Sequence, residues 1–331
     1  MAFTNTAAQQ TAVNTTIDDQ FYRDVLAGLT STPKHLDSKY FYDAQGDKLF
    51  QELMGCEEYY PTNCEMEIFT SQTAELCKAI ISDGDAFDLI ELGAGDATKS
   101  TELLKYLIDN KADFTYLPID ISENVISYLN ITLPVTLPGI KIEGLNGEYF
   151  DMLKKAAAIS DKRKVVMFLG SNIGNMPVAD AQAFCKELRA NLSEGDMLLI
   201  GVDLKKNPAT VLAAYNDKGG ITKRFNLNLL DRINRELGGD FNTRQFDHYA
   251  MYDPETGSCK SYLVSLADQK VKIGQQTISF QKDEYIYMEI SQKYAIAEVD
   301  DLANQANFTP LNQFFDNKKW FLDAIWRAEQ G

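Results

Sequence analysis

The sequence predicts an α/β fold in which a Rossmann-like core, built on a mainly parallel sheet, carries an inserted domain of mixed α/β structure. The first observation is an apolar run at Phe87–Leu92 that ends in the turn Gly93-Ala94-Gly95 and is followed by a helical pattern at Thr98–Asp109. The second is the apolar run Phe114–Ile119, which ends in Asp120, about 25 residues after the turn. A glycine turn with an acid at the tip of the next strand is typical of sheets that bind a nucleoside.

Composition limits the class of protein. The chain has 331 residues and a formal net charge of −16, so its surface repels phosphate backbones and nucleic acid is not an expected partner. No apolar run is long enough to cross a bilayer, and residues 1–16 lack the pattern of a signal peptide. We therefore expect a disordered leader at 1–16 and a cytoplasmic protein without a membrane partner. With five scattered cysteines and two histidines, we expect reduced thiols and no metal site.

Residues 17–62 form an N-terminal helical and aromatic segment that is expected to contribute to the substrate lobe. Periodic apolar residues predict a helix at Asp18–Leu29, and tyrosine and phenylalanine are frequent between Lys39 and Pro61. Asn63 is expected to cap one long helix that ends near Ile81.

Residues 63–205 show the alternation of strands and helices that predicts a parallel sheet with helices on both faces. The expected strands are Phe87–Leu92, Phe114–Ile119, Ile140–Gly144, Lys164–Leu169 and Met197–Val202. The expected helices are Thr98–Asp109, Glu123–Leu129, Tyr149–Ala158 and Ala179–Leu192.

The pattern changes to short alternating strands in residues 206–290, which predicts an inserted substrate-binding lobe with antiparallel pairing. Its helices are expected at Ala209–Tyr215 and Lys223–Leu237, and a hairpin turn at Asp253–Gly257. Its strands are expected at Asp247–Tyr252, Lys260–Leu266, Lys270–Ile273, Thr277–Phe280 and Tyr285–Tyr294. Residues 291–331 are expected to return to the core, with a helix at Val299–Ala306 and a closing strand pair at Thr309–Phe315 and Trp320–Ala328.

The glycine turn favours one class of nucleoside ligand. A dinucleotide fingerprint needs a third glycine, and Thr98 stands there instead. A turn with two glycines suits S-adenosylmethionine, which has no pyrophosphate. Lys99 lies one turn into the helix, where it can reach a carboxylate, and Asp120 can accept from ribose hydroxyls. The alternatives are a purely structural turn and a helix-capping role for Asp120.

Two other segments carry polar side chains. Asn175 ends a Gly/Asn-rich turn after a buried strand, and its amide both donates and accepts, which suits the amine and carboxylate of an amino acid; asparagine is also a common turn residue. On the strand at Tyr285–Tyr294, period two puts Tyr287, Glu289 and Ser291 on one face. They can hold a small polar ring or form a solvated strand face.

These segments together resemble the histidine-specific Nα-methyltransferases of ergothioneine biosynthesis over about residues 20–295. The resemblance implies a class I methyltransferase Rossmann-like core with an inserted mixed α/β substrate-binding domain. It also implies S-adenosylmethionine as cofactor and three successive methylations of an amino acid's α-amine. The residues that carry it are Ala27–Thr30 with Pro33 and Lys34, Phe41–Asp43 with Gly46, Glu58–Thr62, Glu91–Gly93 with Lys99, Phe168–Ser171 with Ile173–Asn175, Asp203 and Leu204, Ala214 and Tyr215 with Asp217 and Thr222, Phe225 and Asn226, Ile233–Leu237, and Glu289 with Ser291.

The same resemblance implies roles for single residues. The cofactor set that it implies is Gly93, Lys99, Asp120, Glu148 and Tyr149, with Tyr42 as a pocket neighbour. Glu148 and Tyr149 replace an Asp-Phe pair that flanks the adenine in the family. The histidine set that it implies is Tyr59, Asn175, Tyr215, Glu289 and Ser291, with Asn175 and Tyr215 at the reacting amino-acid end as the catalytic pair.

One departure concerns the substrate. Ser261 stands where the histidine enzymes carry a methionine against the imidazole. The alternative substrate is therefore a different amino acid or amine, such as a tryptophan derivative. The aromatic residues Tyr42, Tyr59 and Tyr60 either line a wall for a cationic ligand or belong to the core.

Two other classes of function stay open at this point: a nucleotide-dependent oxidoreductase, which the missing third glycine disfavours, and a non-catalytic binding module of the same fold. We expect a small-molecule amino-acid substrate and a monomer.

Overall fold

The computed structural model describes residues 15–81 and 85–329, and the chain divides into two compact units. Unit 1 runs to Tyr59 and includes Pro208–Asp253 and Ser258–Ile290; unit 2 comprises Tyr60–Asn207, Pro254–Gly257 and the chain from Ser291 onward. The leader expected at 1–16 lies outside the described residues except for its last two, which begin helix α1 (Thr15–Thr30). The five-part domain division drawn from the sequence stays a prediction.

Unit 2 is built on a seven-stranded sheet in the order β12-β13-β6-β5-β2-β3-β4. Strands β2 to β6 are parallel, β13 is antiparallel to β6, and β12 is antiparallel to β13. This order, with one antiparallel strand inserted beside the edge, is that of the class I methyltransferase fold, so the predicted fold class is confirmed. The strands are β2 Phe87–Leu92, β3 Phe114–Asp120, β4 Leu145–Asn146, β5 Arg163–Phe168, β6 Met197–Asp203, β12 Phe308–Phe315 and β13 Phe321–Ala328.

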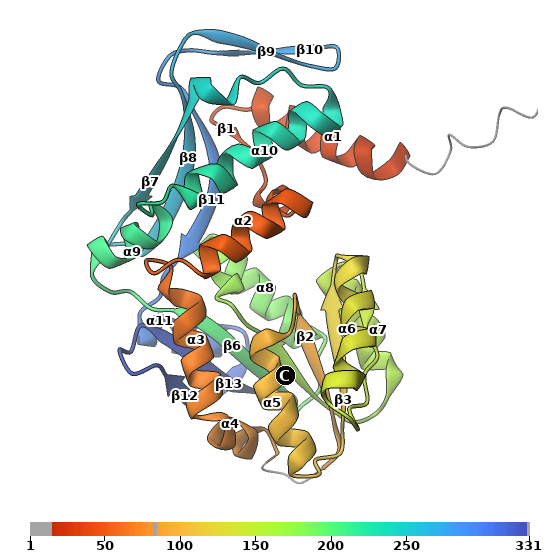
Figure 1. Ribbon diagram of the computed structural model, residues 1–331. Helices are drawn as coiled ribbons and strands as arrows, with labels where there is room; N and C mark the ends of the chain where they lie inside the picture. The colour runs from red at the N-terminus through yellow and green to blue at the C-terminus, as the bar shows by residue number, and fades with distance from the viewer. Residues whose placement is uncertain (1–14, 82–84, 330–331) are drawn as a thin grey trace, which may run out of the picture. The chain divides into compact units, whose positions relative to one another are not determined.

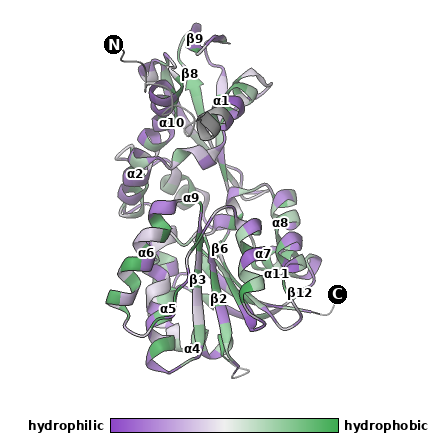
Figure 2. Cartoon of the chain, turned by 90° about the vertical axis from the view of Figure 1, so that its right-hand side faces the viewer, coloured by the Kyte–Doolittle hydropathy of each residue, from purple (hydrophilic) through white to green (hydrophobic). Residues whose placement is uncertain are grey.

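Helices pack on both faces of this sheet. Figure 1 shows α3, α4 and α5 together on one face, and α8 with α11 on the other. The helices of unit 2 are α3 Tyr60–Ser71, α4 Thr73–Ile80, α5 Thr98–Asp109, α6 Glu123–Thr136, α7 Tyr149–Ile159, α8 Val178–Ala190 and α11 Ile296–Gln305. In Figure 2 hydrophobic residues run along the strands, whereas the helices carry hydrophobic and hydrophilic residues together. This is the pattern of a sheet buried on both faces.

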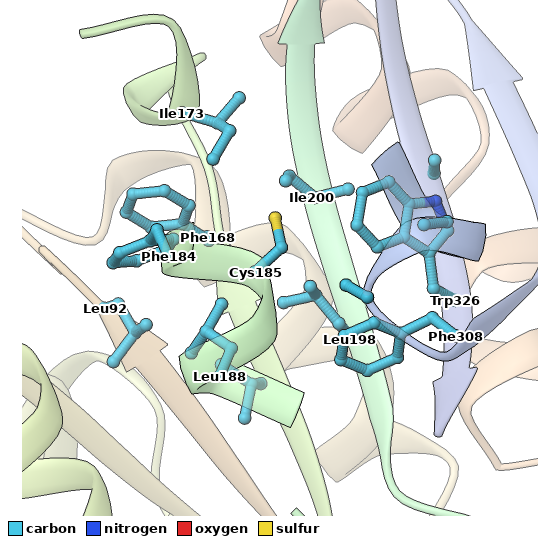
Figure 3. Close-up of a cluster of buried hydrophobic side chains, with 14 of the residues drawn as sticks. Leu92, Phe168, Ile173, Phe184, Cys185, Leu188, Leu198, Ile200, Phe308 and Trp326 are labelled. Carbon is cyan, nitrogen blue, oxygen red and sulfur yellow. The ribbon is translucent and has the colours of Figure 1, made fainter. Parts of the chain in front are cut away.

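The core of unit 2 joins alternate strand residues to α7, α8 and α11. Figure 3 shows this cluster: Leu92, Phe168, Ile173, Phe184, Cys185, Leu188, Leu198, Ile200, Phe308 and Trp326. Trp326 and Phe168 are almost fully buried, and burying such a side chain contributes roughly 1.5–3 kcal/mol. This packing fixes the strand ends from which the functional loops start.

Several sequence predictions for unit 2 are wrong in detail. The strand expected at Ile140–Gly144 is an isolated bridge between Tyr116 and Ile142 before the two-residue β4; the segment has no buried face to hold it in the sheet. The long helix expected from Asn63 is two helices, α3 and α4, with Gln72 between them, and Asn63 lies inside α3. The Gln72 amide at this break donates to the carbonyl of Phe315 (2.8 Å).

Unit 1 contains a four-stranded sheet in the order β1-β11-β8-β7 and the separate hairpin β9-β10. The hairpin predicted at Asp253–Gly257 is confirmed, since β7 and β8 are antiparallel and Asp253 N donates to Ser258 O (2.9 Å). The strands are β1 Lys34–His35, β7 Phe246–Tyr252, β8 Ser258–Ser265, β9 Gln269–Ile273, β10 Gln276–Phe280 and β11 Tyr285–Gln292, whose last two residues belong to unit 2. The helices are α1, α2 Ala44–Met54, α9 Pro208–Tyr215 and α10 Ile221–Leu237.

The turn Gly170–Asn175 packs directly against the end of β11. A Cβ built on Gly174 would lie 2.7 Å from the backbone oxygen of Gln292 and 3.3 Å from its nitrogen. Only glycine permits so close an approach of two backbones. The contact holds the turn that carries Asn175 against the strand end that carries Ser291.

We expect Gly174→Ala to lower the free energy of unfolding by about 2 kcal/mol, because the added methyl meets backbone that cannot rotate away. Urea unfolding followed by circular dichroism measures the loss. The control is Gly55→Ala, where the nearest atom to the added Cβ lies 3.5 Å away; its effect should stay within about 0.5 kcal/mol. Equal effects of the two variants would contradict the packing described for Gly174.

Candidate active site

The residues predicted to bind the cofactor gather, in unit 2, at the carboxyl ends of β2 and β3. Gly93, Gly95 and Ala97 have positive φ angles of 72°, 53° and 53°, so the chain turns sharply before α5. Gly93 N donates to Ile119 O (2.8 Å), and Gly95 N donates to Asp120 Oδ2 (3.2 Å). The Asp120 carboxylate therefore lies against the glycine turn.

The turn is open on one side and covered on the other. A Cβ built on Gly95 would meet no atom of the described chain within 4 Å, whereas one on Gly93 would lie 2.8 Å from Tyr149 Oη. Glu148 precedes Tyr149 as the exposed N-cap position of α7. Backbone with free space beside it, a carboxylate at the next strand tip and an aromatic ring match what adenosine binding requires. The residues present therefore fit S-adenosylmethionine.

Lys99 lies in a network that joins α3, α5 and the turn after β5. Its ammonium forms an ion pair with the buried carboxylate of Glu65, whose Oε1 accepts from Gly170 N (2.7 Å). Burial lowers the pKa of Lys99, but the Glu65 carboxylate outweighs this, and the pKa is raised above its ordinary value. Lys99 is thus held as a cation beside the glycine turns.

A second carboxyl group, that of Asp323 on β13, lies close to the ion pair of Lys99 and Glu65. Both of its oxygens are buried, and within the described part of the chain neither has a hydrogen-bond partner. A Cβ built on Gly201 would overlap Glu65 Oε1 and lie 3.1 Å from Asp323 Oδ1. Burial and the charge of Glu65 raise the pKa of Asp323 well above its ordinary value, although the charge of Lys99 acts in the opposite direction.

Sequence reasoning missed Glu65 and Asp323. A signal existed for Asp323, because an acid inside the apolar strand Phe321–Ala328 is expected to be buried beside a partner. No local signal distinguishes Glu65 from the exposed acids of a helix.

Unit 1 brings Tyr42 and Tyr59 into one aromatic cluster, whereas Tyr60, the third tyrosine of the predicted set, lies buried in unit 2 against Trp320. The ring of Tyr59 makes edge contacts with Tyr215 (centroids 6.1 Å apart) and Phe50 (6.3 Å). Tyr42 contacts Phe50 (5.5 Å) and Phe225 (5.7 Å) in the same way. Tyr42, which the resemblance assigned to the cofactor set, thus lies in unit 1 among aromatic residues and is 48% exposed. The faces of such rings attract a cationic group.

Glu289 lies on β11 with the orientation that period two predicted. Burial alternates from Tyr285 to Ile290, with Tyr287 and Glu289 half-buried on one face, and the last two residues of the strand, Ser291 and Gln292, are both buried. Asn226 Nδ2, from α10, donates to Glu289 Oε1 (3.4 Å). Ser261, on β8 of the same sheet, is buried.

The remaining candidates, Asn175 and Ser291, lie in unit 2. Asn175 is exposed, and its Nδ2 donates to Asn172 Oδ1 (3.5 Å). Ser291 is 7% exposed, and its Oγ accepts from Lys293 Nζ (2.8 Å). The structure therefore groups Tyr42, Tyr59, Tyr215 and Glu289 in unit 1, and Gly93, Lys99, Asp120, Glu148, Tyr149, Asn175 and Ser291 in unit 2.

A family model described as a histidine-specific, S-adenosylmethionine-dependent methyltransferase matches residues 21–328. The chain belongs to this family. The match spans the cofactor turn, the aromatic cluster and the end of β11. The resemblance drawn from the sequence is confirmed.

Several named proteins are similar to this chain in sequence. A histidine N-alpha-methyltransferase of Mycolicibacterium smegmatis is 35% identical over 274 residues, which cover 82% of this chain and 84% of that protein. The ergothioneine biosynthesis protein 1 of Neurospora crassa is 33% identical over 89% of this chain and 33% of its own length. An L-tryptophan methyltransferase of Psilocybe serbica is 28% identical over 93% of this chain and 92% of its own length.

No helix within the described ranges of this methyltransferase combines the length and the apolarity that a bilayer-spanning segment needs.

Glu91, on β2 just before the glycine turn, is a buried titratable group of this methyltransferase. Ser100 Oγ donates to its Oε1 (2.5 Å) and Tyr116 Oη donates to its Oε2 (2.5 Å). Burial raises the pKa of Glu91 to about 7, although both hydrogen bonds act in the opposite direction. Folding therefore favours the protonated carboxyl of Glu91. The stability that this group contributes is present at pH values below the ordinary pKa of a glutamate and is lost as the pH rises toward 7.

We expect Glu91→Gln to flatten this pH dependence, because the amide does not ionise. Between pH 4.5 and pH 7, the free energy of unfolding of the variant should rise by on the order of 3 kcal/mol relative to that of the parent protein. Urea midpoints measured across this range give the difference. Parallel stability curves for the two proteins would contradict the raised pKa.

Proposed function

We propose that this chain methylates the α-amine of free L-histidine with S-adenosylmethionine as donor and forms Nα,Nα,Nα-trimethylhistidine (hercynine). The family match over residues 21–328 supports the reaction class. The similarity to a histidine N-alpha-methyltransferase, at 35% identity, supports the substrate. The observation that carries the proposal is the cofactor turn with Asp120 and Lys99, together with Glu289 and Ser291, which lie two residues apart on β11. The name of the Neurospora relative supports a place in ergothioneine biosynthesis.

In unit 2, the proposed cofactor residues divide the ligand among them. When bound, S-adenosylmethionine supplies a methyl group on a cationic sulfur. The Asp120 carboxylate accepts hydrogen bonds from ribose hydroxyls, and the Lys99 ammonium binds a carboxylate. Gly93 and Gly95 leave room for close approach to the backbone, and Glu148 with Tyr149 flanks the adenine.

The proposed substrate residues hold the two ends of histidine. The Asn175 amide and the Tyr215 hydroxyl form hydrogen bonds with the amine and the carboxylate of histidine. These bonds align the amine nitrogen for an in-line displacement. Glu289 accepts the ring N–H, and Ser291 contacts the other ring nitrogen. The rings of Tyr59 and Tyr42 stabilise the positive charge that grows on the nitrogen with each methyl group.

A second candidate is a methyltransferase of the same fold that acts on another amino acid or amine, such as a tryptophan derivative. Ser261 at a position where the histidine enzymes carry methionine favours it. The Psilocybe relative, whose name states L-tryptophan, is 28% identical.

We further propose that the protein acts as a monomer in the cytoplasm. The net charge of −16 keeps copies of the chain apart, and the cysteines are free, which fits a reducing compartment.

The deciding experiment incubates the protein with S-adenosylmethionine and an equimolar pool of amino acids, followed by mass spectrometry. We expect successive gains of one, two and three methyl masses on histidine, ending in the trimethylated product. Methylation of tryptophan instead would favour the second candidate. No methylated product at all would contradict the enzyme assignment.

We expect Glu289→Ala to raise the Kd for histidine about 10- to 100-fold, because the ring loses a charge-assisted partner, while the Kd for S-adenosylmethionine stays within twofold. Asp120→Ala should do the reverse. Isothermal titration calorimetry measures both ligands.

The matched control is Glu284→Ala, which removes the carboxylate just before β11 that pairs with Lys34 and should leave both affinities unchanged. Equal weakening of both ligands by Glu289→Ala would contradict the role assigned to Glu289.

A further inference from the structure

Asp203, the last residue of β6, is a fully buried carboxylate that holds two lysine side chains. Lys293 Nζ lies 2.6 Å from its Oδ2, and Lys206 Nζ forms an ion pair with its Oδ1. Tyr60 Oη donates to the same carboxylate at 2.8 and 3.1 Å. Lys293 and Asp203 are both 0% exposed. Asp203 is among the residues that carry the family resemblance, and none of the roles proposed above belongs to it.

The cluster carries more positive than negative charge in the interior of unit 2. Burial raises the pKa of Asp203, but the ammonium groups of Lys293 and Lys206 outweigh this and the pKa is lowered, so Asp203 stays ionised. Two buried cations on one anion need further acceptors, since an unsatisfied buried charge is costly. The two lysines donate to different additional acceptors.

The acceptors divide the two lysines into different roles. Lys206 Nζ donates to Tyr60 Oη (2.9 Å) and to Leu204 O (2.5 Å). Lys293 Nζ donates to Ser291 Oγ (2.8 Å). Of the two ammonium groups, Lys293 is therefore the one that acts on a proposed substrate residue.

The bond fixes which way the Ser291 hydroxyl points. An ammonium group carries donors and no acceptor, so Ser291 Oγ must accept from Lys293. Its own O–H is consequently directed to an acceptor other than Lys293. A charged donor on the oxygen also polarises the hydroxyl and strengthens it as a donor.

Asp203 also fixes the backbone around Ser291. Its N–H donates to Ser171 Oγ (3.0 Å), at the start of the turn that carries Asn175. Its carbonyl accepts from Tyr294 N (3.1 Å), just after β11. The turn and the strand end are thus both bonded to this one residue.

We propose that Lys293, held by Asp203, is a positioning residue that makes Ser291 a hydrogen-bond donor to the substrate ring. The inference rests on the proposed function and specifies its selectivity. Glu289 then requires a ring N–H, and Ser291 requires a ring nitrogen that accepts. Neutral imidazole offers one of each, whereas indole offers only the N–H. The polar set thereby selects histidine over tryptophan.

The test compares Lys293→Met with the matched control Lys206→Met. Each variant removes one ammonium from Asp203 and leaves the other. We expect Lys293→Met to raise KM for histidine about tenfold, the effect of one hydrogen bond of about 1.4 kcal/mol. Lys206→Met should stay within about threefold, and both variants should bind S-adenosylmethionine within twofold of the parent protein.

A second measurement separates polarity from folding. The two pyrrolylalanine isomers each keep one ring N–H and replace the other ring nitrogen with carbon. The parent protein should prefer histidine over the isomer that matches Glu289, measured as a ratio of kcat/KM values. This ratio should fall about tenfold in Ser291→Ala and in Lys293→Met, and no further in the double variant. Loss of folded protein does not change a ratio measured on the active molecules.

Each outcome decides the proposal. A smaller ratio in Ser291→Ala and Lys293→Met, without additivity, supports it. It is overturned if Lys293→Met behaves like Lys206→Met, if the two effects add, or if Ser291→Ala keeps the parent ratio; the last comparison holds even where Lys293→Met does not fold. If the parent protein neither binds nor methylates histidine, the proposed function fails and this inference fails with it. If the parent protein does both, only the inference is at stake.

Discussion

The burial of ionised groups at the carboxyl ends of the central strands is the constraint on which the rest of the site depends. Moving an ion out of water costs several kcal/mol unless fixed partners replace the solvent. Asp203 meets this cost with Lys293, Lys206 and Tyr60, and Glu65 meets it with Lys99 and the Gly170 N–H. Because each partner sits on a different loop or helix, satisfying the charge also fixes the loops.

The buried charges around Asp203 and around Glu65 in unit 2 are compensated in different ways. At Asp203 two cations share one carboxylate, so one ammonium has bonding capacity for Ser291. At Glu65 a second carboxyl group, Asp323, has its pKa raised well above the ordinary value by burial and by the charge of Glu65, which favours its neutral form. The neutral form adds no second negative charge beside the Lys99–Glu65 ion pair. In both clusters an ammonium group is fixed in place by a buried carboxylate.

How much the sequence predicts depends on how local each cause is. The strand Phe87–Leu92, the helix Thr98–Asp109 and the glycine turn between them were predicted correctly, because periodicity and turn chemistry act within a few residues. The break at Gln72 was not predicted, since its amide bonds to Phe315. The bonds of Asp203 to Lys293 and of Glu65 to Gly170 likewise join distant parts of the chain. The chemistry of single residues was visible in the sequence, but their partners were not.

The choice between histidine and tryptophan follows from comparing two kinds of specificity. A change in pocket volume, such as Ser261 in place of methionine, discriminates by about 1–3 kcal/mol per methylene. A site built to hydrogen-bond both nitrogens of a ring rejects a ring that lacks one much more strongly, because its own polar groups are left unpaired. Glu289 and Ser291 are the pair proposed to bond the two ring nitrogens here, and the buried Lys293 ammonium donates to Ser291 Oγ. With the roles proposed for Glu289 and Ser291, polarity outweighs the altered volume at Ser261, and the physical argument favours histidine.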